Sequence, residues 1–205
     1  MTIYTHKGDL PADFTCEGVV AVDTETLGLK HNRDRLCVIQ LSDGKGDAHI
    51  VQVVREDYDK APRLKAILAD PSIIKIFHYA RFDVAVIKKY FKVDCAPIYC
   101  TKIASKLSRT YTDRHGLKSV CAELTGVQLD KHQQSSDWAA ETLSDAQQRY
   151  AANDVLYLHE MMAQLNMMLA REGRTELAQS CFDFIPVRAQ LDLAGWEDKD
   201  IFDHA

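Results

Sequence analysis

Apolar and β-branched residues fall into short runs along the first quarter of the chain. Runs of this kind occupy residues 18–22, 35–42 and 48–53, and turn-forming residues at 28–34 and 43–47 separate them. Such runs, bounded by Gly, Asn and Asp, are typical of strands joined by tight connections. The pattern therefore predicts a meander of three antiparallel strands.

After residue 60 the pattern alternates between helix and strand. One more apolar run, residues 72–78, is predicted to be a buried strand. Helix-forming residues occupy four segments around it, and Gly126 provides a C-terminal stop for the last of them. These helices are predicted at residues 62–69, 81–90, 100–108 and 117–125.

The longest helix is predicted to begin at Ser144. Ser144 and Gln147 have the spacing of a capping box, and helix-forming residues continue to Arg171. One or two further helices are predicted over residues 175–194, interrupted near Pro186. A meander needs a covered face and the later helices supply the cover, so the sequence predicts an α/β domain with a mixed sheet.

The composition is that of an ordinary globular domain. The 205 residues are 46% hydrophobic and 27% charged, which suffices for one large domain with its own core. We therefore expect a single domain over residues 1–205, without an additional C-terminal nucleic-acid-binding domain. The net charge of −5 argues against a basic surface that coats long nucleic acid, although a local basic pocket is compatible with it.

The lack of a recognisable sorting signal and the positions of the cysteines favour the cytoplasm. No apolar run approaches the roughly 20 residues of a membrane span, and the first residues lack the layout of a signal peptide. The six cysteines form no C-x-x-C pair and mostly lie among apolar neighbours, which favours reduced, buried thiols over zinc sites or disulfides. We expect a cytoplasmic protein without membrane contact.

Two carboxylates follow the first β-branched run. Asp23 and Glu25 are one residue apart, so a strand would project both side chains from the same side. Like charges so placed repel each other, and either one of them keeps its proton or a divalent cation lies between them. A strand that ends in solvent, where acidic residues are common, is the alternative explanation of this pair.

Three further polar residues have the same ambiguity. Asp83 follows a predicted strand at the start of a helix, which suits either a functional site or an acid favoured by the helix dipole. Tyr150 and Asp154 are four residues apart and share one face of the predicted long helix, either as a surface contact or as part of a site. Each residue alone favours the ordinary explanation, whereas the whole set favours a site.

Taken together, these residues resemble the three motifs of the DEDD superfamily of 3′–5′ exonucleases, in the tyrosine subgroup that includes ribonuclease D. Asp23 and Glu25 match the first motif, and Asp83 matches the second. Tyr150 and Asp154 match the third. The resemblance implies a ribonuclease H-like exonuclease fold, in which an antiparallel meander and βα units form a mixed five-stranded sheet flanked by helices.

The resemblance also implies the chemistry of the site. Two divalent ions, Mg²⁺ or Mn²⁺, about 3.5–4 Å apart stabilise charge on the attacking and leaving oxygens of a phosphodiester, and carboxylates are suitable hard ligands for them. Tyr150 would orient the attacking water, since a phenol with a pKa of about 10 is a poor free base at neutral pH. The implied metal ligands are Asp23, Glu25, Asp83 and Asp154.

A closer resemblance covers nearly the whole chain. Several segments are similar to the nanoRNase C family, compact ribonuclease D-like proteins of alphaproteobacteria. Ribonuclease D usually has Arg-Pro-Leu where this chain has Glu141, Thr142 and Leu143, and that departure favours the compact family. The similar segments lie at residues 22–29, 100–107, 109–118, 133–143 and 191–196.

The compact family implies hydrolysis of diribonucleotides, including linear products of cyclic-dinucleotide breakdown, to mononucleotides, and a ring-like homo-octamer. Longer RNA and DNA substrates are also attributed to this group. Three functions therefore remain open. An exonuclease for very short RNA is favoured over a broader 3′–5′ exonuclease acting on longer RNA or DNA. An inert nucleic-acid-binding module on the same fold would lack at least one metal ligand, and none is missing.

Candidate substrate contacts include one apolar residue and a set of basic or polar ones. Leu27 closely follows the first motif and either wedges against a base or belongs to the core. Basic side chains suit phosphate, although most such charges are solvated faces of helices. Trp138 and Trp196 are expected to be packing anchors rather than stacking platforms. Beside Leu27, the candidates are His78, Lys102, Arg109, Arg114, His115, Lys118 and Lys131.

Overall fold

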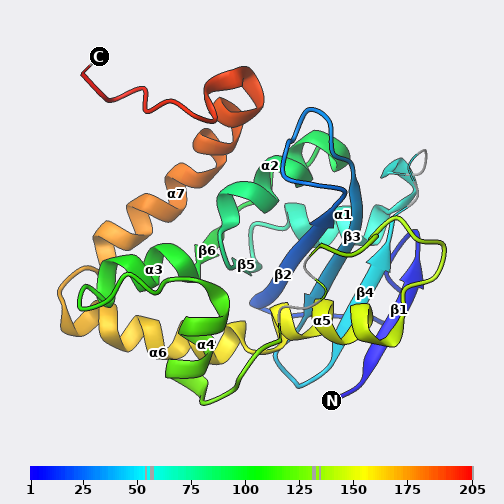
Figure 1. Cartoon of the computed structure of the whole chain (residues 1–205), viewed down its shortest axis with the longest axis horizontal. Helices are drawn as coiled ribbons and strands as arrows, with labels where there is room; N and C mark the ends of the chain where they lie inside the picture. Colours follow the sequence, from blue (N-terminus) through cyan, green and yellow to red (C-terminus); the bar gives the residue numbers. More distant parts are fainter. Residues whose placement is uncertain (54, 56–57, 131–132, 134, 205) are drawn as a thin grey trace.

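A six-stranded sheet with helices on both faces forms the body of the computed structural model, which describes residues 1–53, 55, 58–130, 133 and 135–204 (Figure 1). The strands are β1 (Ile3–Lys7), β2 (Val19–Thr26), β3 (Leu36–Ser42), β4 (Ala48–Gln52), β5 (Ile74–Phe77) and β6 (Ile98–Cys100). The helices are η1 (Tyr58–Lys60), α1 (Pro62–Ala69), α2 (Ala80–Phe91), α3 (Thr101–Ser108), α4 (Leu117–Thr125), α5 (Asp145–Leu156), α6 (Leu158–Arg171), α7 (Thr175–Leu191) and the π-helical turn η2 (Asp192–Trp196).

β2 lies in the interior of the sheet, whose order is β1-β4-β3-β2-β5-β6. It pairs antiparallel with β3, which pairs antiparallel with β4, so the predicted meander is confirmed. β2 also pairs parallel with β5, and β5 pairs parallel with β6, so the sheet is mixed, as expected. β2 continues to Thr26 instead of ending at residue 22, which places Asp23 and Glu25 inside the strand.

The sheet has one strand more than the five expected. β1 pairs parallel with β4 at the edge, and all its side chains are partly or largely exposed, so no apolar pattern marks this strand in the sequence. The sequence pattern also assigns Cys100 to a helix, whereas this residue ends β6 and α3 begins at Thr101. α1 and α4 have the predicted bounds.

α5 begins at the predicted capping box. The Gln147 N–H donates to Ser144 Oγ over 3.3 Å, and the Ser144 N–H donates to Gln147 Oε1 over 3.0 Å. The single long helix expected to Arg171 is wrong, because the chain divides at Tyr157 into α5 and α6. α5 packs on strands β1 to β4, whereas α6 packs chiefly on α3 and α4. Asp154 therefore lies in the last turn of α5.

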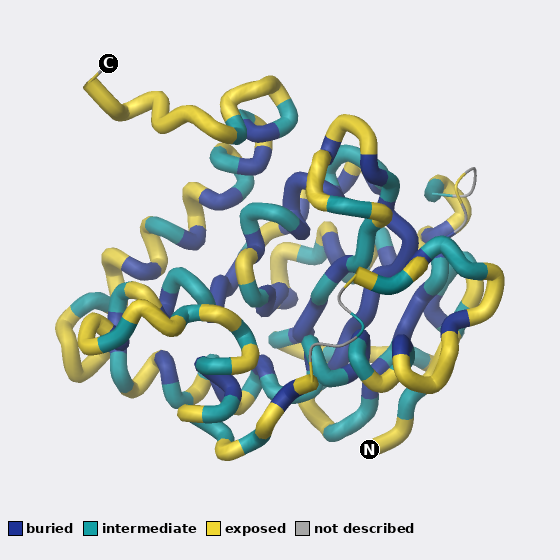
Figure 2. The backbone as a smooth tube through the Cα atoms, viewed as in Figure 1, coloured by how far each residue is buried: buried dark blue, intermediate teal, exposed yellow. Residues whose placement is uncertain are grey.

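α7 passes through Pro186 without a break, so the predicted interruption is wrong. A proline inside a helix removes one backbone donor. Here the buried Phe182, Ile185 and Ala189 and the packing of α7 on α2, α3 and β6 maintain the helix. Residues beyond α7 are mostly exposed (Figure 2). Trp196 is 44% exposed, so the packing role expected for it is wrong.

Two apolar clusters fill the space on the two sides of the sheet. The larger joins α1, α2, α6 and α7 to the strands, and the smaller lies under α5 and contains Val38, Ile50 and Trp138. Trp138 is 2% exposed, which confirms the packing role expected for it. All six cysteines are free thiols and four are buried, as predicted. Among the described helices, none has the length and apolar character that crossing a membrane requires.

Candidate active site

Asp23 and Glu25 project from one side of β2, on the sheet face that α5 covers. Gln40 is the partner of Asp23 in the antiparallel register of β2 and β3, and its Nε2 donates to Asp23 Oδ2 over 2.6 Å. Gln40 is fully buried. A polar residue within the sheet therefore fixes the orientation of the Asp23 carboxylate.

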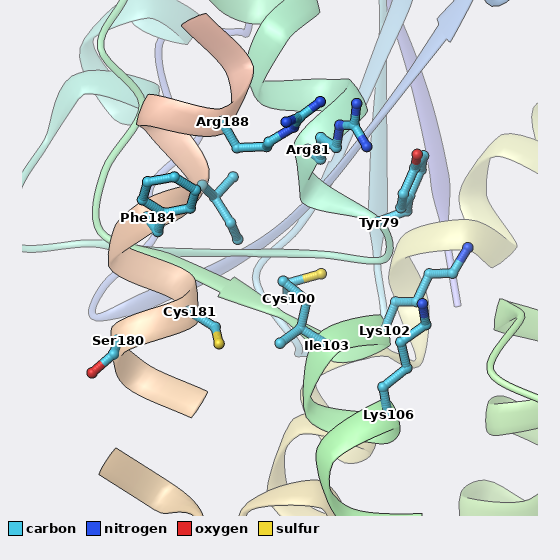
Figure 3. Close-up of a pocket in the computed structure, with 11 residues that line it drawn as sticks. Tyr79, Arg81, Cys100, Lys102, Ile103, Lys106, Ser180, Cys181, Phe184 and Arg188 are labelled. Carbon is cyan, nitrogen blue, oxygen red and sulfur yellow. The ribbon is translucent and has the colours of Figure 1, made fainter. Parts of the chain in front are cut away.

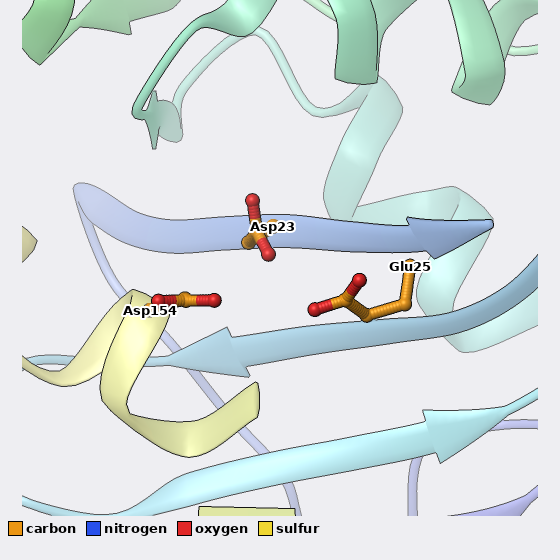
Figure 4. Close-up of side chains that lie close together, drawn as sticks. All are labelled: Asp23, Glu25 and Asp154. Carbon is orange, nitrogen blue, oxygen red and sulfur yellow. The ribbon is translucent and has the colours of Figure 1, made fainter. Parts of the chain in front are cut away.

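α5 supplies the third carboxylate of this cluster. Its packing on β2 and β3 places one oxygen each of Asp23, Glu25 and Asp154 within 4.8 Å of the others. In Figure 4 the carboxyl groups lie between β2 and the end of α5, and Glu25 extends toward Asp154. The alternative that Asp23 and Glu25 are solvated strand-end charges is therefore wrong.

Asp83 comes from α2. The parallel pairing of β2 with β5 ends at Ala21 and Ile76, and the chain then turns through Tyr79 into α2. Thr24 Oγ1 donates to Asp83 Oδ1 over 2.6 Å, and Asp83 is only 3% exposed. Asp83 is an acid in the first turn of α2, as one of its two explanations predicts, and it lines the same cavity as the cluster, so a functional role for it stays a prediction.

Burial and mutual repulsion raise the pKa of these carboxyl groups. Burial raises the pKa of Asp23 from 3.8 to about 7, against a smaller opposing effect of a backbone hydrogen bond at Thr24. Burial, followed by the charges of the neighbouring carboxylates, raises the pKa of Glu25 well above its ordinary value. Burial, followed by the charge of Asp23, also raises the pKa of Asp83 well above its ordinary value. So many negative charges at one site are unfavourable unless a cation neutralises them.

The donor set fits a divalent cation such as Mg²⁺ or Mn²⁺. Asp23, Glu25 and Asp154 offer hard carboxylate oxygens, which these ions prefer over nitrogen or sulfur. Among the residues that the structure describes, this trio is the one group of acidic, histidine or cysteine side chains close enough together to hold an ion. A bound cation would also displace the protons that burial retains on these carboxylates.

Tyr150 lies one helical turn before Asp154 on α5. Burial, followed by the charges of the neighbouring carboxylates with Asp154 first, raises the pKa of Tyr150 above its ordinary value of 10.0. The Tyr150 ring lies 5.9 Å from that of Trp138, measured between ring centroids. Because the phenol keeps its proton at neutral pH, its hydroxyl is able to donate a hydrogen bond.

These side chains line a cavity of about 440 Å³. Leu27 also lines it and is 51% exposed, so the alternative that Leu27 belongs to the core is wrong. His78 lines the same cavity, and its Nδ1 lies 2.8 Å from Thr101 Oγ1. Other lining comes from the loop after β2, the start of α2 and two serines: Gly28, Leu29, Tyr79, Phe82, Ser135 and Ser136.

The predicted basic contacts occupy different positions. Two of them, Lys102 and Lys118, line an adjoining cavity of about 240 Å³ that also reaches the acidic cluster. Arg114 is exposed. His115 Nδ1 lies 2.9 Å from the hydroxyl oxygen of a serine on α3. Lys131 lies outside the described residues.

Arg109 requires a correction to the predicted set. Its side chain is fully buried, and its guanidinium forms an ion pair with Glu123. The same group donates to Ser105 Oγ over 2.8 Å and to the Arg114 carbonyl over 2.9 Å. These contacts hold the connection between α3 and α4, so the Arg109 guanidinium is engaged within the fold rather than directed at a substrate phosphate.

Several polar residues of the site are absent from the sequence-based set, and three of them have a notable contact or conformation. Gln40 stands among apolar residues in β3, and a lone amide in a buried strand is the signal that points to it. Thr24 lies between the two acidic residues of β2 and holds Asp83. Tyr79 has a φ of 79°, a left-handed conformation uncommon for a residue with a Cβ, and no sequence pattern indicates it.

The chain is similar to known nucleases over most of its length. A family model described as 3′–5′ exonuclease matches residues 9–170. Ribonuclease D of Acidiphilium cryptum is 36% identical over 160 residues, which are 78% of this chain and 40% of that protein. The chain thus spans less than half the length of this relative.

Two solved structures of Brucella melitensis NrnC are similar to the whole chain. NrnC bound to pGG has 55% sequence identity and a TM-score of 0.96. NrnC with bound Mg²⁺ has 54% identity and a TM-score of 0.94, and both comparisons cover 100% of each chain. These similarities confirm the resemblance and the fold that the sequence motifs predict.

Proposed function

This chain belongs to the 3′–5′ exonuclease family, and from that premise we propose that it is a metal-dependent exoribonuclease for very short RNA. The proposed substrates are diribonucleotides, including linear products of cyclic-dinucleotide breakdown, and the products are 5′-mononucleotides. The observation that carries the proposal is the grouping of Asp23, Glu25 and Asp154 within 4.8 Å, with Asp83 lining the same cavity. Such a set of carboxylates suits metal-assisted hydrolysis of a phosphodiester.

Two divalent ions, Mg²⁺ or Mn²⁺, are part of the proposal. The residues that would hold them are Asp23, Glu25, Asp83 and Asp154, and the Mg²⁺ bound to Brucella melitensis NrnC supports this choice. When bound, such ions stabilise charge on the attacking and leaving oxygens of the scissile phosphate. Gln40 keeps the Asp23 carboxylate in one orientation through its 2.6 Å hydrogen bond, so the ligand set is organised before the substrate arrives.

The chain's own side chains orient the reactants. Tyr150 keeps its proton because burial and the adjacent carboxylates raise its pKa, so its hydroxyl donates a hydrogen bond that orients the attacking water. Leu27 and Leu29 are 51% and 78% exposed and offer apolar surface against which a base can pack. Together these groups orient the water and the base relative to the scissile bond.

The size of the cavity supports a short substrate. Its volume of about 440 Å³ lies within the range of pockets that enclose small ligands, about 300–1,000 Å³. The pGG bound to Brucella melitensis NrnC supports the same substrate class here. Proposed phosphate contacts are His78, Lys102, Arg114 and His115, and a neighbouring subunit is a further source of basic side chains.

A broader 3′–5′ exonuclease acting on longer RNA or DNA is the second candidate. The similarity to ribonuclease D favours it, although the match covers 40% of the Acidiphilium cryptum protein. We propose that residues 1–205 form a single catalytic domain. An inert nucleic-acid-binding module is disfavoured, because the four carboxylates and Tyr150 all line one cavity.

We further propose a homo-oligomer, specifically an octamer, located in the cytoplasm. The free cysteines support a reducing compartment. A cavity of about 550 Å³ between α3 and α7 has Ile103 and Phe184 on its walls (Figure 3). Ile185 also lines it, and an apolar face of this kind supports assembly. Light scattering on the eluting protein should give the mass of eight chains. Exposed apolar residues on α7 and in the segment after it are Leu177, Phe184, Val187, Trp196, Ile201 and Phe202.

A length series tests the proposed function. Purified protein is timed on 5′-labelled RNAs from two nucleotides upward, with Mg²⁺ and in parallel with EDTA. We expect metal-dependent conversion of the dinucleotide to be much faster than that of longer RNA, and slower when the dinucleotide lacks its 5′ phosphate. Similar rates at all lengths would instead establish the broader exonuclease, and no hydrolysis at any length would refute both candidates.

A further inference from the structure

The chain beyond α7 contacts two elements that line the catalytic cavity. After Leu191 the helix continues as the π-helical turn Asp192–Trp196, in which Gly195 has a φ of 102°. We term residues 192–197 the C-terminal clamp. Its side chains and carbonyls contact two separate walls of the cavity, namely the start of α2 and the loop 27–34 that follows β2.

The first contact joins the clamp to α2. Asp192 is 2% exposed and accepts two hydrogen bonds from Arg81, at 2.6 and 2.8 Å, while its Oδ1 also lies 2.9 Å from Arg188. Arg81 donates in addition to the Glu197 carbonyl over 2.5 Å. Figure 3 shows Arg81 and Arg188 extending from α2 and α7 into the same region. A bidentate pair with a buried carboxylate fixes geometry, and Arg81 lies two residues before Asp83.

The second contact joins the clamp to the loop 27–34. Lys30 Nζ donates to Glu197 Oε1 over 2.7 Å, and His31 Nδ1 lies 3.6 Å from Glu197 Oε2. Lys30, and then His31, hold the pKa of Glu197 below its ordinary value, so the carboxylate is charged at neutral pH. The His31 ring lies 4.9 Å from that of Phe82, which lines the cavity.

The loop 27–34 is braced internally. The Lys30 N–H donates to Asp34 Oδ2 over 2.9 Å. Gly28 lies so close to the Asp34 carboxylate that a Cβ at this position would clash with it. A contact that restrains Lys30 therefore also restrains Leu27 and Leu29, which lie in the same loop and line the cavity.

We propose that the C-terminal clamp holds the loop 27–34 against α2 and so sets the position of Leu27 and Leu29 for the substrate base. Glu197 and Lys30 are positioning residues in this account, because they act on substrate through the loop. The inference rests on the proposed function for its substrate. The match to the family model ends at residue 170, so the clamp lies outside the matched region.

The test uses Glu197→Ala, with Glu197→Gln as the conservative variant. Asp59→Ala is the matched control, because Asp59 accepts an ion-pair hydrogen bond from Lys65 at the same 2.7 Å and does not line the cavity. Hydrogen–deuterium exchange of residues 27–34 reports on the loop without substrate. The KM and kcat for a 5′-phosphorylated diribonucleotide with Mg²⁺ report on how the loop affects substrate binding and turnover, and the melting temperature reports on the fold.

In Glu197→Ala we expect faster exchange in residues 27–34, a KM raised about two- to five-fold with kcat retained, and a melting temperature within about 2 °C of wild type. Glu197→Gln should recover part of the loss, and Asp59→Ala should change neither exchange nor KM. Unchanged exchange in residues 27–34 would overturn the clamp, as would faster exchange with an unchanged KM. Lack of hydrolysis by the wild type would refute the proposed function alone, since exchange still tests the clamp.

Discussion

Replacing one carboxylate of the acidic cluster should stabilise the metal-free fold and abolish metal-dependent hydrolysis. We consider Asp23→Asn in EDTA. The wild-type Asp23 carboxyl has its pKa raised from 3.8 to about 7, so stability is lost as pH rises through this interval and the carboxylate becomes charged among its neighbours. The asparagine never acquires that charge, and its Oδ1 can still accept the hydrogen bond from Gln40.

The magnitude follows from the pKa shift. At 1.36 kcal/mol per unit, the change in the Asp23 pKa from 3.8 to about 7 corresponds to about 4 kcal/mol above neutral pH. An amide buried in place of the carboxyl keeps its own desolvation cost, which reduces the net gain to roughly 2 kcal/mol. For a chain of this length that gain raises the melting temperature by about 4–8 °C.

Differential scanning fluorimetry at pH 8 in EDTA measures this gain. Asp13→Asn is the control, because it makes the same chemical change at an exposed aspartate outside the cluster. Mg²⁺ at one hundred times its dissociation constant should stabilise the wild type by about 2–3 kcal/mol. It should stabilise Asp23→Asn much less, so that in Mg²⁺ the wild type has the higher melting temperature. If Asp23→Asn melts below the wild type in EDTA at pH 8, the account of a buried and unneutralised charge on Asp23 is refuted.

Three further substitutions separate the roles of neighbouring residues. Tyr150→Phe should lower kcat about 10²-fold and leave Mg²⁺ affinity unchanged, since the phenol orients rather than binds; kinetics with a Mg²⁺ titration would show an equal loss of affinity if this were wrong. Gln40→Leu should weaken Mg²⁺ binding about 10- to 100-fold by calorimetry, because the Asp23 carboxylate loses its donor, and unchanged affinity would contradict that role. Arg109→Met should lower stability by about 2–3 kcal/mol in urea denaturation without raising KM, because Arg109 pairs with Glu123 within the fold; a selective rise in KM would restore it as a substrate contact.

The strands of the meander and most helix boundaries follow from local pattern. Residues 35–42 and 48–53 are apolar and β-branched, and Ser144 with Gln147 specifies a helix start through bonds within four residues. These features depend on neighbours in the sequence. Hydrophobic periodicity and capping therefore predict them without knowledge of the rest of the fold.

Features that depend on distant partners are not predictable in this way. β1 exists because β4 presents a backbone edge, and its own side chains carry no pattern of burial. α7 continues through Pro186 because α2, α3 and β6 pack against it. The break at Tyr157 arises because α5 and α6 pack on different surfaces. In each case tertiary contacts outweigh local propensity.

The candidate site likewise contains features that follow from local spacing and features that depend on distant partners. The spacing of Asp23 and Glu25, and of Tyr150 and Asp154, places each pair on one face of its own element, so those pairs are predictable. The basic groups that face the cavity, in contrast, are not predictable from local spacing. Arg109 is buried and pairs with Glu123, which is fourteen residues away, and no sequence pattern indicates that pairing.

Hydrolysis by Asp154→Asn tests the central claim most directly. A 5′-phosphorylated diribonucleotide is incubated with the wild type and with Asp154→Asn, each with Mg²⁺ and with EDTA, after circular dichroism has shown that both are folded. If the acidic cluster is a metal-dependent nuclease centre, the wild type forms mononucleotide product with Mg²⁺ but not with EDTA, and the variant forms none in either condition. Product from Asp154→Asn in ample Mg²⁺, at a rate near that of the wild type, would contradict the claim.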